Sequence, residues 1–389
     1  MKRVRSLIPQ LISANFGIMC FSYIYFLLPL YLEHVGISAP QTVGWILGAY
    51  YAASTLPRPF MAFIVEKLPF RSTLSAAVLL CLAGSAGLAL SGSSVIFMWL
   101  CRLVMGFSFG LFLVAVTTYQ TMVVPDEVRG GTFALVTVGA MAPFLVVVPT
   151  ADWFLQRGHF EAYIWMGPVV ALGCLALALT FRPVGDSRPS GGETWGTWKE
   201  LFALGPVRTL FVSAVLYGLT DAAVISISTL AMDRGLISSF FMSAFAAGAV
   251  LVRLAGFRLM DSLPRFVMAA WIFAFTSVAL MLTAWATTNA MFAVCGFLYG
   301  LGIGVGFPLY LSLIGDVAPP RLRPKATAML WFILDGCFFV TPVIMGYAST
   351  AFGVAGAFRI VPGVIFFTAL PAWLFLWKPL VRSSKKNPS

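Results

Sequence analysis

Long apolar stretches follow one another along nearly the whole chain, and short breaks between them carry most of the charged residues. The stretches are continuous rather than alternating, and each is long enough for the ~20-residue helix that crosses a bilayer. This pattern predicts an all-α polytopic membrane protein with twelve transmembrane helices. It argues against a transmembrane β-barrel, whose strands alternate apolar and polar positions. The predicted spans are 8–32, 41–65, 72–91, 95–123, 132–154, 162–181, 207–231, 238–257, 266–286, 289–317, 326–349 and 355–377.

The longest polar stretch, 182–206, divides these spans into two sets of six and is rich in Gly, Pro and Ser. Such a composition is typical of a linker. We therefore predict an N-terminal six-helix bundle over 1–181, a cytoplasmic linker over 182–206, a second bundle over 207–378 and a cytoplasmic tail over 379–389. Apolar residues near the end of the linker predict a short amphipathic helix at the membrane surface; they are Trp195, Trp198, Leu201 and Phe202.

A charged break between apolar runs occurs twice in the chain. Arg58 precedes Glu66 by eight positions, and Arg253 precedes Asp261 by the same spacing, with Leu-Pro after each carboxylate. The two arginines are 195 residues apart, which is half the chain. An offset of this size indicates an internal duplication.

Glycines repeat at nearly the same offset. Gly106 and Gly110 in the fourth predicted span correspond to Gly300 and Gly304 in the tenth, 194 residues later. The sequence therefore predicts two pseudo-symmetric six-helix bundles in parallel repeat. No strand precedes these glycines and no lysine follows, so close helix packing explains them better than a nucleotide-binding loop.

Composition agrees with a membrane protein, since 60% of the 389 residues are hydrophobic and only 10% are charged. Soluble domains carry roughly 25% charged residues. The net charge of +11 comes mainly from Lys and Arg in the breaks on one side of the predicted membrane, which argues against nucleic-acid binding. By the positive-inside rule this side is cytoplasmic, and both termini lie there.

The break after the second span resembles a loop motif of the major facilitator superfamily, Gly-x-x-x-Asp-Arg/Lys-x-Gly-Arg-Arg/Lys. Here it reads Ala62-Phe-Ile-Val-Glu66-Lys67-Leu-Pro69-Phe-Arg71, with Glu in place of Asp and with Ala62 and Pro69 in place of the glycines. The fourth span matches the family pattern of an Arg followed four residues later by Gly. With the twelve spans and the repeat, the resemblance covers about residues 8–377.

Arg58-Pro59 before this motif resembles the bacterial efflux branch of the superfamily, which includes drug–proton antiporters, sugar-efflux permeases and metallophore exporters. The antiporter motif of the fifth helix is degenerate at 138–143, where Pro143 lacks a following Gly pair. The resemblance implies a monomeric transporter in the bacterial inner membrane that moves a small organic solute by alternating access, with protons as the drive and no cofactor. An uptake symporter, a lipid exporter and a transport-inactive sensor or scaffold stay open as alternatives.

The same resemblance implies that the charged breaks latch the two bundles in one state of the transport cycle. The conformational-switch residues would then be Arg58, Glu66, Lys67, Arg71, Arg253 and Asp261. Determination of topology alone is the alternative role for these charges.

Three of the ionisable residues inside predicted spans are candidates for a function there, because a charge within a bilayer costs roughly 2.5–3.5 kcal/mol. Asp221 and Asp335 are candidates for proton coupling, because low-dielectric surroundings favour the neutral form of a carboxylic acid. A structural hydrogen bond or ion pair is the alternative for each. Arg102 could bind an anionic substrate or pair with a carboxylate, and the resemblance implies proton coupling for it.

Aromatic residues in the spans are candidates for a substrate cavity, with packing or lipid contact as the alternative role. They are Tyr23, Tyr119, Tyr217, Phe307, Tyr310 and Trp331. The six cysteines lie in apolar runs without metal-site spacing, so no metal is predicted. The histidines, His34 and His159, fall in predicted outer loops and are far apart in sequence, and no set of residues suggests an enzyme.

Overall fold

The computed structural model describes residues 8–58, 60–61, 64, 68–123, 139–181, 197–262, 265–319 and 322–381. In these residues all regular structure is helical, and the chain folds as two compact units, Met1–Ser190 and Gly191–Ser389. The division falls within the predicted linker, whose boundaries at 182 and 206 stay a prediction. Each predicted span contains a helix, so the prediction of an all-α fold with helices in these places is confirmed.

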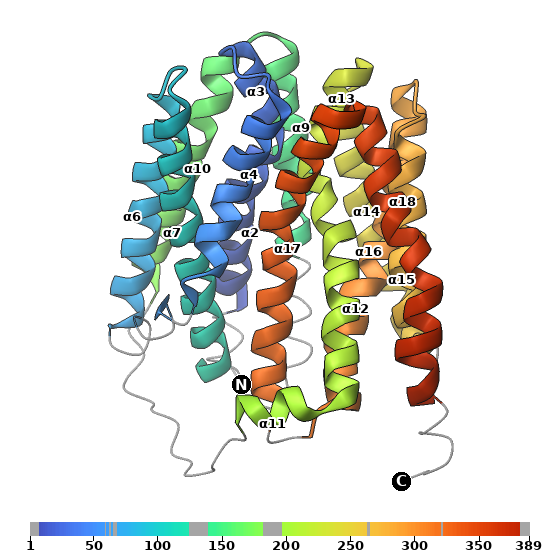
Figure 1. The fold of residues 1–389 in the computed structure, drawn as a ribbon. Helices are drawn as coiled ribbons and strands as arrows, with labels where there is room; N and C mark the ends of the chain where they lie inside the picture. Colours follow the sequence, from blue (N-terminus) through green and yellow to red (C-terminus); the bar gives the residue numbers. More distant parts are fainter. Residues whose placement is uncertain are drawn as a thin grey trace. The chain divides into compact units, whose positions relative to one another are not determined.

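The first unit contains one long helical path for each of the six predicted spans (Figure 1). In chain order they are α2 (Ile8–Ile24) with η1 (Tyr25–Leu27) and α3 (Leu28–His34), then α4 (Pro40–Thr55), α6 (Phe70–Ala89), α7 (Val95–Val123), α9 (Pro143–Gln156) and α10 (Phe160–Thr180). Helix α7 packs between α4 and α6, α10 packs on α6 and α2, and α2 packs on α9.

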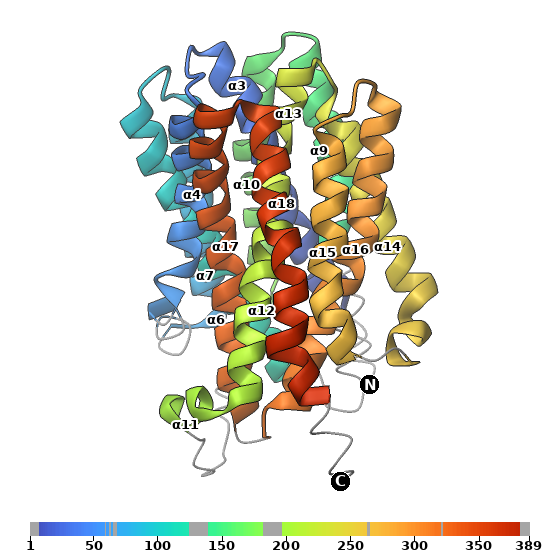
Figure 2. The same cartoon turned by 45° about the vertical axis from the view of Figure 1, so that its right-hand side comes forward.

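The second unit repeats this arrangement (Figure 2). Its helices are α11 (Trp198–Ala203), α12 (Gly205–Ala222) with η3 (Ala223–Ser226) and α13 (Ile227–Arg234), then α14 (Ser238–Ser262), α15 (Arg265–Thr283), α16 (Asn289–Val317), α17 (Arg323–Phe352) and α18 (Val354–Pro371), which ends in a π-helical turn (Ala372–Trp377). Helix α16 packs between α14 and α15, α18 packs on α15, and α12 packs on α17. Each of these four pairs corresponds to a packing pair of the first unit, as a duplication requires.

The first long helix of each unit is interrupted by a short 3-10 segment, η1 in the first unit and η3 in the second. A 3-10 segment inside a long helix changes the hydrogen-bond period, so some carbonyls lose their usual partners. The repeat therefore extends to a local irregularity that the hydropathy pattern does not predict.

The helices have the length and surface of membrane spans. Nine helical stretches among the described residues are long and apolar enough to cross a bilayer. Ser238–Arg253 is a shorter apolar helix, and α4 and α9 have 16 and 14 residues. Large apolar side chains stand on the outside, with Ile96, Phe367 and Phe375 each at least three-quarters exposed. A water-soluble surface avoids such contiguous apolar exposure, whereas lipid favours it.

The short helix predicted at the end of the linker is present as α11, which runs across the foot of α12 in Figure 1. It begins with a capping box, because the Thr197 hydroxyl accepts from the Glu200 amide at 3.2 Å and a Glu200 carboxylate oxygen accepts from the Thr197 amide at 3.4 Å. Leu201 is buried, while Trp198 and Phe202 are exposed with their rings stacked at 6.4 Å. This amphipathic pattern fits a helix at a membrane surface.

Candidate functional site

Arg102 lies in the interior of the first unit and is only 2% exposed. Its Nε donates to the Ile46 carbonyl of α4 at 3.3 Å, and one terminal nitrogen donates to the Leu47 carbonyl at 3.4 Å. The other terminal nitrogen has no hydrogen-bond partner among the described residues. A buried cation that is held only by carbonyls keeps an unsatisfied donor, which is costly in a low-dielectric interior.

Aromatic faces supply the rest of the environment of Arg102. Its guanidinium carbon lies 4.5 Å from the ring centre of Tyr50 and 5.5 Å from that of Tyr25. Both distances allow a cation–π attraction, which strengthens when water is excluded. Tyr163 completes the wall of this cluster and donates its hydroxyl to the Ile24 carbonyl at 3.0 Å. The cluster holds a fixed positive charge inside the unit.

The helix that carries Arg102 approaches α4 closely along a stripe of small residues. A side chain at Gly106 would collide with the Tyr50 carbonyl, and one at Gly110 would meet the Ser54 carbonyl at 2.6 Å. Arg102 lies one turn before Gly106 on the same stripe. The glycines therefore permit the contact that places Arg102 against α4.

The second unit has the same stripe of small residues, with a glycine at each of its three positions. Side chains at Gly296, Gly300 and Gly304 would meet the backbone of Phe241, Phe245 and Ala249 in α14. These carbonyl partners lie 195 residues beyond Ile46, Tyr50 and Ser54. Arg102 thus occupies the position that is Gly296 in the second unit.

Asp221 lies at the end of α12, where the helix passes into η3, and is half-buried. Its carboxylate interacts electrostatically with Arg253 of α14. The Tyr299 hydroxyl of α16 donates to the Asp221 carbonyl at 2.6 Å and to the Thr220 carbonyl at 2.9 Å. The site therefore combines a carboxylate, a guanidinium group and a tyrosine hydroxyl that binds the backbone where α12 passes into η3.

Arg253 lies within α14 and donates its Nε to the Gly304 carbonyl of α16 at 3.3 Å. Sequence reasoning grouped it with Asp261 as a switch at a helix end. Helix α14 continues to Ser262, so the backbone of Asp261 is helical, and its side chain lies outside the described residues. In the structure Arg253 contacts α16 through the Gly304 carbonyl and acts electrostatically on Asp221.

Asp335 is half-buried on α17, the helix that packs on α12. Trp331 lies one turn earlier on the same face and contacts Phe307 with ring centres 5.1 Å apart. This places one proton-coupling candidate near two of the cavity candidates, within a single unit.

Tyr217 and Tyr310 pack inside the second unit and are fully buried. Their rings stack at 4.9 Å, and the Tyr310 hydroxyl donates to the Ala269 carbonyl at 2.9 Å. Tyr23 is also buried, stacked on Phe144 at 3.7 Å. These three residues act as packing elements in this structure. The side chain of Tyr119 lies outside the described residues.

The remaining switch candidates lie in and around the break after α4. The Nε of Arg58 donates to the Ser54 carbonyl one turn earlier at 3.4 Å, and Arg71 is exposed in the first turn of α6. Glu66 and Lys67 lie outside the described residues. The structure thus describes Arg58 and Arg71 without describing the loop between them.

One buried carboxylate escaped the sequence reasoning. Asp152 of α9 is 1% exposed, and the Gln156 amide donates to it at 3.3 Å. It acts electrostatically on Tyr163, which in turn is influenced by Arg102. Its place inside the predicted span 132–154 was the available signal, because an ionisable residue within a span is a functional candidate.

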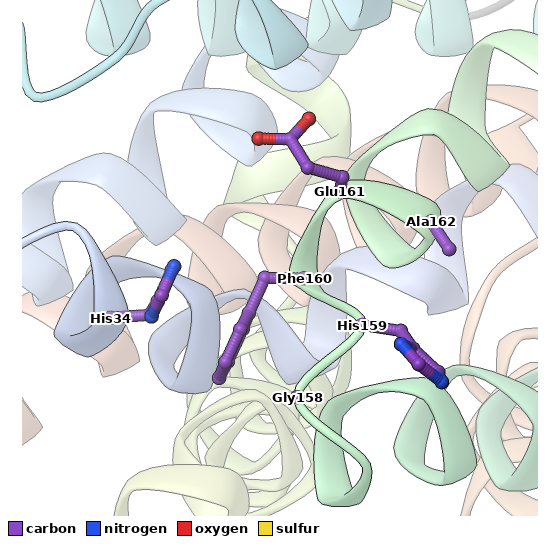
Figure 3. Close-up of a pocket in the computed structure, with 6 residues that line it drawn as sticks. All are labelled: His34, Gly158, His159, Phe160, Glu161 and Ala162. Carbon is purple, nitrogen blue, oxygen red and sulfur yellow. The ribbon is translucent and has the colours of Figure 1, made fainter.

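The two histidines, which are far apart in the sequence, border one open pocket of about 400 Å³ at an end of the first unit (Figure 3). The His34 and Phe160 rings stack at 3.7 Å, almost parallel, while the His159 ring points to the other side of the chain. Among the described residues no group of three or more His, Cys, Asp or Glu could hold a metal ion. The cysteines are all free and buried.

These features define a polytopic helical membrane protein made of two repeated units, each with buried charge. The chain belongs to the Major Facilitator Superfamily, whose family model matches residues 11–335 and 210–389.

Two curated relatives are transporters, and the matched region spans less than half the length of either. "Probable anion transporter 4, chloroplastic" of Arabidopsis thaliana is 29% identical over 162 residues, which cover 39% of this chain and 29% of the relative. "Arabinose-proton symporter" of Bacillus subtilis (strain 168) is 28% identical over 226 residues, which cover 54% and 42%.

Solved transporter structures share the fold over nearly the full chain. The nucleoside transporter NupG aligns with a TM-score of 0.76 at 14% identity, covering 95% of this chain and 99% of NupG. A POT family transporter in complex with a thioalcohol-conjugated peptide aligns with a TM-score of 0.77 at 11% identity, covering 95% of each chain. At these identities the likeness extends to the fold alone.

Proposed function

We propose that the protein is a secondary active transporter that couples proton movement to the export of a small organic solute by alternating access. The observation that carries the proposal is Asp221, a carboxylate within an apolar helical stretch of 30 residues, with Arg253 as a neighbouring charge. An ionisable group in that setting is costly to maintain and serves a transport pathway in most membrane proteins. The family membership supports transport as the activity.

Asp221 and Asp335 are the proposed proton-binding groups. Arg102 is proposed to take part in proton coupling as a fixed positive charge, because such a charge favours the ionised form of an acid near it. Both acids lie on helices of the second unit that pack together. The drive is a proton gradient rather than ATP, because the sequence contains no Gly-x-x-x-x-Gly-Lys-Ser/Thr phosphate-binding loop.

Drug-like, sugar-like and metallophore-like solutes are the proposed substrate classes. The cavity candidates Phe307 and Trp331 offer aromatic faces, and Asp335 offers a charge one turn away, which suits amphipathic or weakly charged molecules. The protein is further proposed to act as a monomer in a bacterial inner membrane, with both termini in the cytoplasm.

Reconstitution into liposomes that contain the trapped pH dye pyranine tests the proposal. The solute panel is arabinose, uridine, ethidium and a zwitterionic metallophore. One of these solutes is expected to move protons in wild type and much less in Asp221→Asn. An absence of solute-dependent proton movement in wild type across the panel would contradict proton coupling for these classes.

A second candidate is uptake by proton symport on the same fold. It is favoured by the relative named arabinose-proton symporter, whereas Arg58-Pro59 favours export. Everted and right-side-out vesicles distinguish the two. Under the physiological gradient an exporter accumulates solute in everted vesicles and a symporter in right-side-out vesicles.

A further inference from the structure

An open pocket of about 280 Å³ lies in the first unit, where α4 and α7 begin side by side. We call it the tryptophan pocket, and its lining residues are Thr42, Trp45, Ile46, Val95, Ile96 and Trp99. Trp45 and Trp99 are each more than one-third exposed. Because five of the six lining residues are aromatic or aliphatic, the pocket suits an apolar ligand.

The tryptophan pocket is continuous with the apolar surface that the unit presents to lipid. Ile96 borders the pocket and is 76% exposed, and the next residue of α7, Phe97, is exposed as well. An acyl chain of the bilayer therefore reaches the pocket without crossing water. The volume is slightly below the ~300–1,000 Å³ of pockets that enclose a whole drug-sized ligand, so part of a larger molecule fits it better.

The corresponding place in the second unit is built differently. The offset of the repeat, 195 residues for α4 and 194 for α7, relates Thr42 to Ile237 and Val95 to Asn289. The Asn289 side-chain carbonyl accepts from the Ile237 amide at 2.8 Å, so a hydrogen bond joins the starts of α14 and α16. Neither Thr42 nor Val95 can reproduce this bond, because neither has an amide side chain. The duplication alone therefore does not account for the tryptophan pocket.

The tryptophan pocket adjoins the contact that holds Arg102. Ile46 borders the pocket, and its carbonyl accepts from the Arg102 Nε at 3.3 Å. Trp99 precedes Arg102 by three residues, so the two are neighbours on the surface of α7. One turn after Arg102, α7 approaches the backbone of α4 at Gly106. A ligand that binds only when this helix contact is made stabilises the contact.

We propose that the tryptophan pocket binds one acyl chain of a bilayer phospholipid, and that the bound chain stabilises the contact of α4 with α7 beside Arg102. Tryptophan is enriched where the hydrocarbon of a bilayer meets the head groups, because its ring is apolar and its N–H donates a hydrogen bond. Trp45 and Trp99 each lie in the first two turns of their helices, which fits this depth. The binding is non-covalent and does not rest on the proposed function.

Native mass spectrometry of the purified protein tests the proposal by counting retained phospholipids. The protein is extracted in mild detergent from bilayers of phosphatidylethanolamine and phosphatidylglycerol. Thr42→Trp fills the pocket, and Trp99→Ala removes one wall by introducing the residue type of Ala293, the counterpart in the second unit. Wild type is expected to retain one phospholipid more than either variant.

Trp165→Ala is the matched control for the loss of a tryptophan. Trp165 of α10 is 40% exposed, against 37% for Trp99, and does not line the tryptophan pocket. This variant is expected to retain the wild-type number of phospholipids. A loss in Trp165→Ala equal to that in Trp99→Ala would overturn the proposal, because the loss would then follow from any exposed tryptophan.

A phospholipid with a photoreactive diazirine on one acyl chain locates the bound chain in wild type and needs no variant. Labelling is expected several-fold more at 42–46 and 95–99 than at the corresponding 237–241 and 289–293 of the second unit. Equal labelling of the two units would overturn the proposal.

Thermal unfolding of delipidated protein tests the effect of the bound chain on the helices. Added phosphatidylglycerol is expected to raise the unfolding temperature of wild type by several degrees more than that of Thr42→Trp, because only wild type has a free pocket. Dodecyl maltoside added to the same chain concentration is expected to give less stabilisation. An equal rise in wild type and Thr42→Trp, or an equal rise with the detergent, would overturn a phospholipid site.

Discussion

Arg102 shows how a single charge is kept inside a membrane unit where no carboxylate among the described residues is in direct contact with it. Two backbone carbonyls of α4 accept from it, and each carbonyl oxygen has a second lone pair beyond its helical hydrogen bond. The faces of Tyr25 and Tyr50 add attraction that needs no negative charge. The arginine therefore stays charged and fixed, which suits a residue that biases the charge state of its surroundings.

Substitution of Tyr50 tests this account. Tyr50→Leu removes the ring nearest to the guanidinium and is expected to destabilise the protein by about 2–4 kcal/mol, from lost packing together with the lost cation–π attraction. Tyr50→Phe keeps the ring face and is expected to stay close to wild type, because the corresponding residue of the second unit is Phe245. Thermal unfolding in detergent measures both, and equal losses in the two variants would contradict a cation–π role.

At the residue scale, sequence reasoning identified buried charges but not their partners. Asp221 and Arg102 stood out because they interrupt apolar spans. The contact of Arg253 with the Gly304 carbonyl depends on the rotation of α14 about its axis, which the close approach at Gly304 constrains. Hydropathy contains no such information, so Arg253 was assigned to a loop switch on its spacing from Asp261.

At the scale of the element, the glycine stripes determine how closely neighbouring helices pack. In each unit the central helix lies against its neighbour at glycines spaced by four residues, where any side chain would meet a carbonyl. The sequence predicted close packing and the offset of the repeat. It did not predict that Arg102 stands where the second unit has Gly296. Arg102 donates to the Ile46 carbonyl, whereas Gly296 only lies close to the corresponding carbonyl of Phe241.

Alanine at Gly300 is expected to destabilise the protein by about 1–3 kcal/mol, because the new methyl group overlaps the Phe245 carbonyl and forces α14 away from α16. Gly315 is the control, since it lies in the same helix with no atom within 4 Å of an added methyl group. Gly315→Ala is expected to be neutral or to stabilise by up to about 1 kcal/mol. The unfolding temperatures of the two variants are compared. A Gly300→Ala variant that unfolds at the wild-type temperature would contradict this account, because it would show that α14 and α16 separate easily.

At the scale of the molecule, two units with matching packing pairs give the duplicated architecture, while the superfamily assignment rests on the family model that matches the chain. Apolar length predicted the helices, and repeated landmarks predicted the duplication. Substrate and direction could not be predicted, because they depend on a few side chains and on their order of binding rather than on the pattern that makes helices. Nor did the pattern predict the 3-10 segments, since their residues are as apolar as the helices around them.

Glu66 is expected to act on the movement between states rather than on substrate binding. Its location in the charged break, at the position of the family's loop acid, suggests that Glu66→Gln lowers turnover by about tenfold, which corresponds to ~1.4 kcal/mol of lost preference for one state. Initial rates in proteoliposomes and equilibrium solute binding measure the two effects separately. Normal turnover, or a matching loss of affinity, would rule out a switch role.

The exchange of glycine for arginine on one stripe has a consequence for the history of such chains. The same helix contact is made with Arg102 in the first unit and with Gly296 in the second. A single base change converts any arginine codon to a glycine codon. A descendant could therefore lose the buried charge in one step while still folding and inserting, and lineages of stable but transport-silent copies are an expected by-product of the duplication.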